Sequence, residues 1–328
     1  MKQAVSHYIM PGERAGDMEK IIKKLHLDGI ENLVYGTEPA PHPAASLTLG
    51  CHLAYWPDWM DFYLGKKDFY EKDFPTRKSL INTFCGVTVE DWIETIRRNI
   101  RAALAEQPEY LVWHVAHCSL DEIWTRRFRY TDRDVLKAAA EVYSALASEI
   151  PPTVKVLFEN IFWPGLYTLK PEEVDYFFRL LPGNNVGIML DTGHLMNTCP
   201  DLEIETQGVR YVCDVVNRLG SLKSLIQGIH LSCSLSGAYR KSLSGTIPTP
   251  VTPDIISRHI TAIDQHRPFA DDAAREIIDT VEPLYVTHEL FGRDFSIPEK
   301  EVERQMKAAG LWPVSGLPQE EKADCFGK

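Results

Sequence analysis

Eight short segments rich in Val, Ile, Leu and aromatic residues recur along the chain, and helical patterns separate most of them. Strands are predicted at Ala4–Met10, Gly29–Tyr35, Ser46–Leu53, Glu109–Ala116, Thr153–Asn160, Val186–Asp191, Leu225–Leu231 and Pro283–Leu290. Helices are predicted at Thr88–Glu106, Thr131–Glu149, Pro171–Leu181, Gln207–Arg218 and Pro298–Ala309. Eight buried strands that alternate with helices are typical of a closed, parallel (β/α)8 TIM barrel. A doubly wound open sheet is the alternative, but no GxGxxG or Walker loop follows any of these segments.

The length of the chain predicts one barrel domain with extended loops. Its 328 residues exceed the length of about 250 that is typical of a TIM barrel. The surplus falls in Ala54–Val87 and Ser232–Asp272, which predicts long βα loops after strands 3 and 7. No low-complexity linker divides the chain. We therefore predict a single domain over residues 1–312 and a polar C-terminal tail over residues 313–328.

Composition and charge indicate a cytoplasmic enzyme that does not bind membranes. No run of about 18 apolar residues occurs, and Met1–His7 lacks the continuous apolar segment of a secretory signal. Seven cysteines without a CxxC pair indicate reduced thiols. The net charge of −11 disfavours non-specific binding to nucleic acids through the long-range field. An anionic substrate would therefore need local positive charge, such as a metal site. The sequence makes no prediction of oligomeric state.

Side chains of the types that bind metals recur at the ends of the predicted strands. Each strand from the third to the eighth ends in or near a His, Asp or Glu, and further ones follow the seventh strand in a loop. These residues are His52, His114, Glu159, Asp191, His194, His230, Asp264, His266 and Glu289. A single histidine at a strand end is usually structural. In a barrel, however, the C-terminal ends of all strands lie on one rim, so the repeated pattern predicts a shared metal site.

This pattern resembles the xylose isomerase-like TIM-barrel superfamily, and within it most of all the apurinic-site endonuclease (endonuclease IV) branch. The resemblance covers roughly His52 to Glu289, and its strongest motifs are Asp191-Thr192-Gly193-His194 and Asp264-Gln265-His266. It implies that the cations are divided among three sets of ligands. The first cation would be held by His52, His114 and Glu159, the second by Glu159, Asp191, His230 and Glu289, and the third by His194, Asp264 and His266.

The donor set favours two to three divalent cations. Five imidazoles and four carboxylates without a thiolate suit Zn first, with Mn or Fe as alternatives. Three divalent cations would outweigh the charge of the carboxylates, which favours a phosphodiester. We therefore expect a metal-dependent hydrolase in which a metal-bound hydroxide attacks a phosphodiester. Glu159 and Glu289 are the predicted catalytic carboxylates. A small molecule or cofactor, such as a cobamide, is favoured over a nucleic acid as the substrate.

Three other functions stay open at this point. The resemblance implies that single-metal isomerases also carry counterparts of Glu159 and Glu289, and a sugar isomerase or epimerase would use these two carboxylates to move protons. A multinuclear non-haem iron oxidase could use the same ligands. A non-catalytic metal scaffold is a further alternative. The extra ligands beyond a single-metal set favour the hydrolase, namely His52, His114, His194, Asp264 and His266.

Four residues near the strand ends are candidates for substrate binding. Tyr55 follows His52 by three residues, where endonuclease IV-type proteins have a tyrosine near the substrate. Trp56 begins an unusually aromatic segment, which is either a self-packed lid or a platform for a flat ligand. Arg127 lies in a cationic cluster after the fourth strand, which is either a solvated helix start or a phosphate clamp. Arg240 lies in a polar loop after the seventh strand.

Two histidines close to the expected site are predicted to be structural. His117 lies in a loop and belongs to no motif. His288 directly precedes Glu289 on the same strand, so the alternation of side chains turns it to the opposite face.

Overall fold

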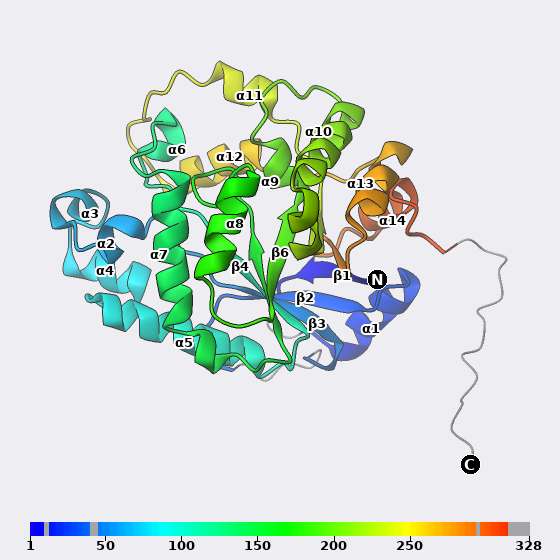
Figure 1. The fold of residues 1–328 in the computed structure, drawn as a ribbon, viewed down its shortest axis with the longest axis horizontal. Helices are drawn as coiled ribbons and strands as arrows, with labels where there is room; N and C mark the ends of the chain where they lie inside the picture. Colours follow the sequence, from blue (N-terminus) through cyan, green and yellow to red (C-terminus); the bar gives the residue numbers. More distant parts are fainter. Residues whose placement is uncertain (10–12, 40–44, 293–295, 314–328) are drawn as a thin grey trace, which may run out of the picture.

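Eight parallel strands close into a barrel in the computed structural model, which describes residues 1–9, 13–39, 45–292 and 296–313. Each strand pairs with its neighbour in the sequence, and the last pairs with the first (Figure 1). The strands are β1 (Lys2–His7), β2 (Gly29–Val34), β3 (Thr48–Leu53), β4 (Tyr110–His114), β5 (Lys155–Glu159), β6 (Val186–Asp191), β7 (Ile226–Leu231) and β8 (Tyr285–His288). The predicted (β/α)8 barrel is confirmed.

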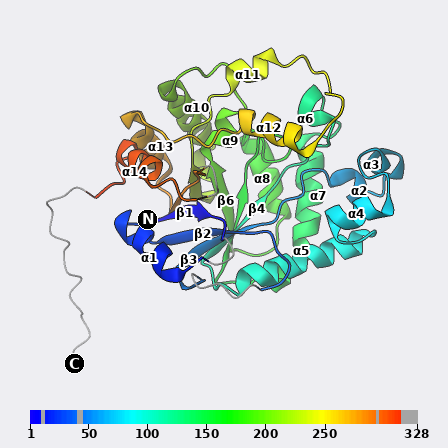
Figure 2. The same cartoon turned by 180° about the vertical axis from the view of Figure 1, so that it is seen from behind.

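Helices surround the barrel on its outer side (Figures 1 and 2). Those outside the long segments after β3 and β7 include α1 (Ala15–Lys24), α5 (Val89–Leu104), α7 (Asp132–Ser144), α8 (Pro171–Leu180), α10 (Glu205–Arg218), α13 (Arg275–Val281) and α14 (Glu299–Ala308). Helix α5 shows why the boundaries follow the sequence. The hydroxyl of Thr88 accepts a hydrogen bond from the Asp91 backbone N–H, and the Asp91 carboxylate accepts one from the Thr88 backbone N–H. This reciprocal pair satisfies N–H groups that the first turn leaves free.

Several predicted elements were too long. The segment predicted as one helix over Thr131–Glu149 is α7 followed by a separate 3-10 turn at Ala147–Glu149. The strand predicted over Glu109–Ala116 ends at His114, although the Val115 N–H still donates to the Glu159 carbonyl. The strand was predicted from its apolar composition, which indicates burial. Because buried residues continue past the last paired residue, the predicted strand is longer than the observed one. Met10, predicted in the first strand, and residues 314–328 of the predicted tail lie outside the described residues.

The long segments after β3 and β7 hold further helices. The first holds α2 (Met60–Tyr63), α3 (Lys67–Asp73) and α4 (Arg77–Phe84), and the second holds α11 (Gly237–Ser242) and α12 (Pro253–Ile263). Two more short helices are α6 (Glu122–Thr125) and α9 (Thr192–Met196). Helix α9 directly follows β6, so the end of the barrel where α6, α9, α11 and α12 gather is its C-terminal rim (Figures 1 and 2). Among the described helices, none has both the length and the apolar character that crossing a bilayer requires.

The barrel interior changes from apolar to charged toward this rim. Apolar side chains that pack together inside the barrel are Ala4, Leu49, Tyr110, Val112, Leu157, Met189 and Tyr285. The Tyr110 ring lies over Gly50, where an added Cβ would approach the ring Cζ to 2.1 Å. Above this layer, the Tyr110 hydroxyl donates to Glu31 Oε2 at 2.8 Å. The apolar layer therefore supports a buried carboxylate from below, and the rim above it carries the candidate site.

Candidate metal centre

Glu159, the last residue of β5, lies at the middle of the candidate site. Its Oε2 atom is 3.1 Å from His52 Nε2 at the end of β3 and 2.7 Å from His114 Nε2 at the end of β4. The ligand atoms of these three residues lie within 4.8 Å of one another. Glu159 is fully buried, and His52 is 3% exposed. The structure thus brings together the first set of predicted ligands.

The second set surrounds the Nδ1 atom of His230 on β7. This atom is 3.1 Å from Glu159 Oε1, 3.5 Å from Glu289 Oε2 and 3.9 Å from Asp191 Oδ2. All four residues are buried, and their ligand atoms lie within 4.8 Å of one another. Because Glu159 uses its other oxygen here, its carboxylate joins the first two sets.

The third set comes from α9 and from the loop after α12. Asp264 Oδ2 lies 3.1 Å from His194 Nε2 and 2.8 Å from His266 Nε2. Asp264 and His266 are half-buried, and His194 is buried. His266 has a positive φ of 43°, so the chain turns sharply after α12 and returns this ring to the centre. The structure therefore brings all the predicted ligands to one rim in three sets.

Opposite charges in the centre shift the pKa values of its members. Burial alone would raise the pKa of Glu159, but His114 and His230 hold it well below its usual range. Burial alone would lower the pKa of His230, but the charges of Glu31 and Glu159 raise it well above its usual range. Without a bound cation, Glu159 and His230 therefore stabilise each other's charged forms, whereas burial lowers the pKa of His114.

The third set shows the same balance. Burial alone would lower the pKa of His266, but Asp264 and Glu289 raise it to about 10. Near Asp191 the balance fails, since burial raises the pKa of this carboxyl well above its usual range and the charge of Glu289 adds to the effect. The imidazoles therefore do not offset the burial of every carboxyl in the centre.

Buried oxygens within the centre fit divalent cations. Asp191 Oδ2, Glu289 Oε2 and Asp264 Oδ1 have no hydrogen-bond donor among the described residues. A buried acceptor without a partner is costly, and a cation supplies the missing partner. The oxygen and imidazole donors, without a thiolate, are those that suit Zn, Mn or Fe. The residues present therefore fit the cations that the sequence predicts, and their identity and number stay predictions.

Sequence reasoning missed one carboxylate of the centre. Glu31 on β2 is fully buried, and its Oε1 atom lies 2.9 Å from His230 Nε2. Hydroxyls of Tyr110 and Thr287 lie at 2.8 and 3.0 Å from its Oε2 atom. Glu31 sits in the middle of its strand, so it did not match the pattern of strand ends. An acidic residue in the middle of a predicted buried strand was the signal that could have found it.

The two histidines predicted to be structural have structural partners. His288 faces α14, where its Nδ1 lies 3.0 Å from Gln305 Nε2, and burial lowers its pKa to about 3. His117 Nδ1 accepts hydrogen bonds from the backbone N–H groups of Trp59 and Met60 at 3.3 Å. Neither ring is in any of the three ligand sets.

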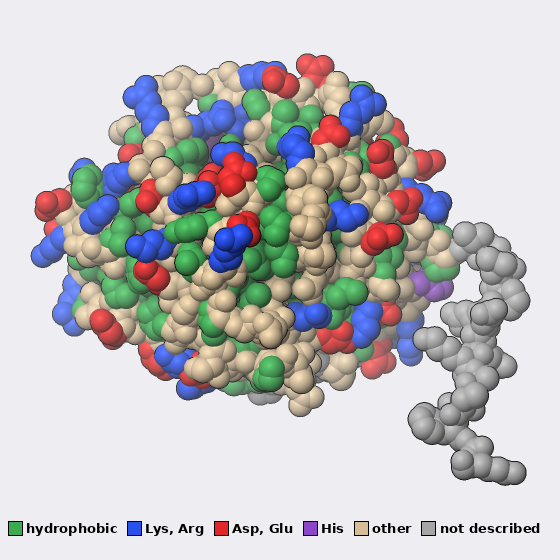
Figure 3. Space-filling view, in the orientation of Figure 1, with side chains coloured by type: hydrophobic (Ala, Val, Ile, Leu, Met, Phe, Trp, Pro, Cys, Tyr) green, Lys and Arg blue, Asp and Glu red, His purple; other side chains and the backbone are tan. Residues whose placement is uncertain are grey.

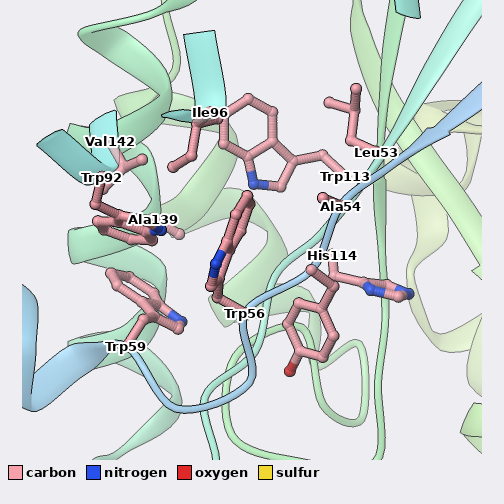
Figure 4. Close-up of a pocket in the computed structure, with 11 residues that line it drawn as sticks. Leu53, Ala54, Trp56, Trp59, Trp92, Ile96, Trp113, His114, Ala139 and Val142 are labelled. Atoms are coloured by element: carbon pink, nitrogen blue, oxygen red, sulfur yellow. The ribbon is translucent and has the colours of Figure 1, made fainter. Parts of the chain in front are cut away.

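Tyr55 and Trp56 differ in how they relate to the centre. The Tyr55 ring lies edge-on to His114, with 4.4 Å between the ring centroids, and no described residue hydrogen-bonds its buried hydroxyl. Trp56 instead packs among other tryptophans, while the His114 ring points away from them (Figure 4). Its Nε1 donates to the Thr83 carbonyl at 2.7 Å, and the cavity on the side of Trp59 and Trp92 measures only about 40 Å³. A second cavity of about 280 Å³, which Trp56 lines together with Trp163 and Ile260, lies beside the same residue. The face of the aromatic segment toward Trp59 and Trp92 therefore packs on itself, and ligand binding by Trp56 stays a prediction.

The two arginines predicted to bind substrate line one cavity. Arg127 follows α6 and Arg240 lies within α11, and both border a cavity of about 360 Å³ at the C-terminal rim. Neither belongs to the ligand sets of the metal centre.

Comparison with known proteins gives matches in structure alone, because no family model and no curated sequence matches the chain. Endonuclease IV from Thermus thermophilus matches with a TM-score of 0.52 and 12% identity, over 95% of this chain and 98% of that chain. The 3-keto-D-glucoside 4-epimerase from E. coli gives a TM-score of 0.49 and 14% identity, over 94% of this chain and 99% of that chain. Mannonate dehydratase from Streptococcus suis gives a TM-score of 0.48 and 13% identity, over 97% of this chain and 98% of that chain. The chain therefore shares the TIM-barrel fold of endonuclease IV, in agreement with the predicted fold.

Proposed function

We propose that the protein is a metal-dependent hydrolase that cleaves a phosphodiester in a small molecule or cofactor. The observation that carries this proposal is the third ligand set, in which Asp264 lies between His194 and His266. A single-metal isomerase would need only the set around His230. A chain that also brings a separate set to the same rim is better suited to several cations.

The charge of the centre supports the same reaction class. With Glu31 included, the centre holds five carboxylates, namely Glu31, Glu159, Asp191, Asp264 and Glu289. Two divalent cations would leave this set net negative, and three would leave it net positive. A phosphodiester is itself an anion, so we expect hydrolysis when all three sets are filled.

Individual residues of the chain would have different roles in such a reaction. Glu159 would hold two cations at once through its two oxygens, and Glu289 would contribute to the second. Tyr55 has a buried hydroxyl beside His114 that can donate a hydrogen bond to substrate. When bound, clustered divalent cations lower the pKa of a water and stabilise the charge that develops on the phosphodiester.

Hydrolysis of bis(p-nitrophenyl) phosphate by the full chain loaded with Zn, Mn or Fe tests the proposal. We expect release of p-nitrophenol that His266→Ala abolishes, while circular dichroism shows a retained fold. The matched control is His26→Asn, which changes an exposed histidine outside the ligand sets and keeps a residue type that tolerates its φ of 55°. Full activity in His266→Ala, or no hydrolysis with any of the three metals, would overturn the proposal. Incision of an oligonucleotide with an abasic site, at low enzyme concentration, would show that DNA is the substrate instead.

A further inference from the structure

Three arginines converge on one cavity between α6 and α11. The cavity measures about 360 Å³, and Arg126, Arg127 and Arg240 line it together with the polar residues Thr125 and Ser244. Both helices lie at the C-terminal rim, and Lys and Arg side chains gather over this edge of the molecule beside a hollow (Figures 1 and 3). We call this space the arginine cavity.

Arg240 is unusual because it is buried and still charged. It is only 5% exposed, and its guanidinium donates a hydrogen bond to the backbone carbonyl of Asn197. Burial lowers the pKa of Arg240, and the nearby charge of Arg126 lowers it further. An arginine remains protonated in proteins even so, and burying its charge therefore requires compensation.

No carboxylate supplies that compensation in the described part of the chain. Neither Arg126, Arg127 nor Arg240 forms an ion pair there, although Arg129 in the same segment pairs with Asp61 and lies over the Phe69 ring. The sequence left two roles open for this cationic cluster, a solvated helix start and a phosphate clamp. Its arginines differ in their partners, and so they differ in role. Arg129 is a structural cation, whereas Arg126 and Arg127 present uncompensated charge to a cavity.

We propose that the arginine cavity binds a phosphate group of the substrate. Guanidinium groups match the geometry of phosphate oxygens, and three of them around one volume would balance its charge. The hydroxyl of Ser244, which also lines the cavity, can donate a hydrogen bond to the same anion. We assign the cavity to a phosphate other than the one that is cleaved, since none of the three arginines belongs to a ligand set of the metal centre.

Helix α9 connects the arginine cavity to the metal centre. His194 of the third ligand set lies on α9, and Asn197, which accepts the hydrogen bond from Arg240, follows the last residue of that helix. A substrate that spans both sites would carry two anionic groups, a phosphodiester over the cations and a terminal phosphate in the arginine cavity. This statement about the substrate rests on the proposed hydrolase function, whereas phosphate binding by the arginines does not.

Calorimetric titration with inorganic phosphate tests the arginine cavity directly. The full-length chain is titrated in the presence of a chelator, so that no cation at the metal centre competes for phosphate. We expect saturable binding by the wild type, weakened about tenfold or more in the double variant Arg126→Gln/Arg127→Gln. Both side chains are exposed, so this variant is expected to fold where Arg240→Gln, at a buried site, is at risk. The matched control is Arg179→Gln, which changes an arginine 77% exposed on α8.

The outcomes separate the two proposals. Unchanged phosphate affinity in the double variant, an equal loss in Arg179→Gln, or no saturable binding by the wild type would overturn the phosphate site. Binding of malonate as tight as that of phosphate would overturn the choice of phosphate over carboxylate. None of these results depends on hydrolysis, and the activity assay with bis(p-nitrophenyl) phosphate does not require a terminal phosphate, so either proposal can fail alone.

Discussion

The Nε2 atom of His230 lies 2.9 Å from Glu31 Oε1, while its Nδ1 atom faces Glu159 at 3.1 Å. The ring is thus held between a carboxylate on its inner side and the second ligand set on its outer side. A carboxylate that accepts the N–H of a histidine fixes which ring nitrogen faces a metal and increases its basicity. Glu31 therefore acts on the centre through His230, as a positioning residue.

Glu31→Gln should weaken cation binding without removing a ligand. The amide keeps the shape of the side chain but loses the charge that favours the Nε2-protonated ring. We expect cation affinity to fall by about 10- to 100-fold, measured by competition with a chromogenic chelator. Glu94→Gln, at an exposed position on α5, is the control and should leave affinity unchanged. Wild-type affinity in Glu31→Gln would show that the contact with His230 has no role in cation binding.

Asp264→Asn should remove one cation and leave the others in place. The Asp264 carboxylate lies between His194 and His266, and no other carboxylate joins these two rings within the third set. We expect one fewer bound cation per chain by elemental analysis, with a retained far-ultraviolet circular dichroism spectrum. Asp279→Asn changes an exposed carboxylate on α13 and should leave the count at its wild-type value. An unchanged count in Asp264→Asn would mean that the third set holds no cation.

Cation binding should release protons. Because Asp264 and Glu289 raise the pKa of His266 to about 10, its ring is protonated at neutral pH when no cation is bound. A cation must displace this proton, so its apparent affinity should rise with pH up to about 10. Calorimetry at pH 7.5 in two buffers of different ionisation enthalpy measures the number released. We expect about one proton or more for the cation of the third set, and a value of zero would contradict the protonated state.

The stability of the fold should fall in mild acid because of His117. Burial lowers the pKa of His117 to about 4, whereas an unfolded histidine has a pKa of about 6.5. Between about pH 6.5 and 4, His117 binds a proton in the unfolded chain but not in the folded one. Its contribution to the unfolding free energy is therefore fully present above about pH 6.5 and is lost as the pH falls to about 4. The loss amounts to about 3 kcal/mol of unfolding free energy. Urea denaturation at a series of pH values should show a shallower acid decline in His117→Gln than in the wild type. Equal slopes would indicate that His117 titrates normally in the folded chain.

The barrel was predictable from the sequence because each strand is buried on both faces and therefore apolar. The end of a strand was predictable where a charged residue breaks this run, as Asp191 does at the end of β6, whereas the end predicted for β4 ran two residues too far. In a closed parallel barrel these breaks all lie on the same rim. The convergence of the ligands follows from that geometry.

The role of Glu31 and the arginine cavity could not be predicted from the sequence, and the physical reasons differ. Glu31 occupies the middle of β2, and the sequence gives the face of a strand residue but not its depth relative to neighbouring strands. Arg126 and Arg240 meet only because the segments after β4 and β7 fold toward each other. The path of these segments depends on packing, such as the stacking of Trp124 on His259 at 3.9 Å between ring centroids, which no local pattern encodes.

The number of cations bound per chain is the most direct test of the metal centre. The full-length protein is loaded separately with Zn, Mn and Fe, freed of excess metal by gel filtration, and analysed by inductively coupled plasma mass spectrometry. We expect two to three cations per chain with the preferred metal, because the ligand atoms within each of the three sets lie within 4.8 Å of one another. One cation per chain would point to a single-metal isomerase or epimerase, and none would contradict the assignment of a metal centre to this rim.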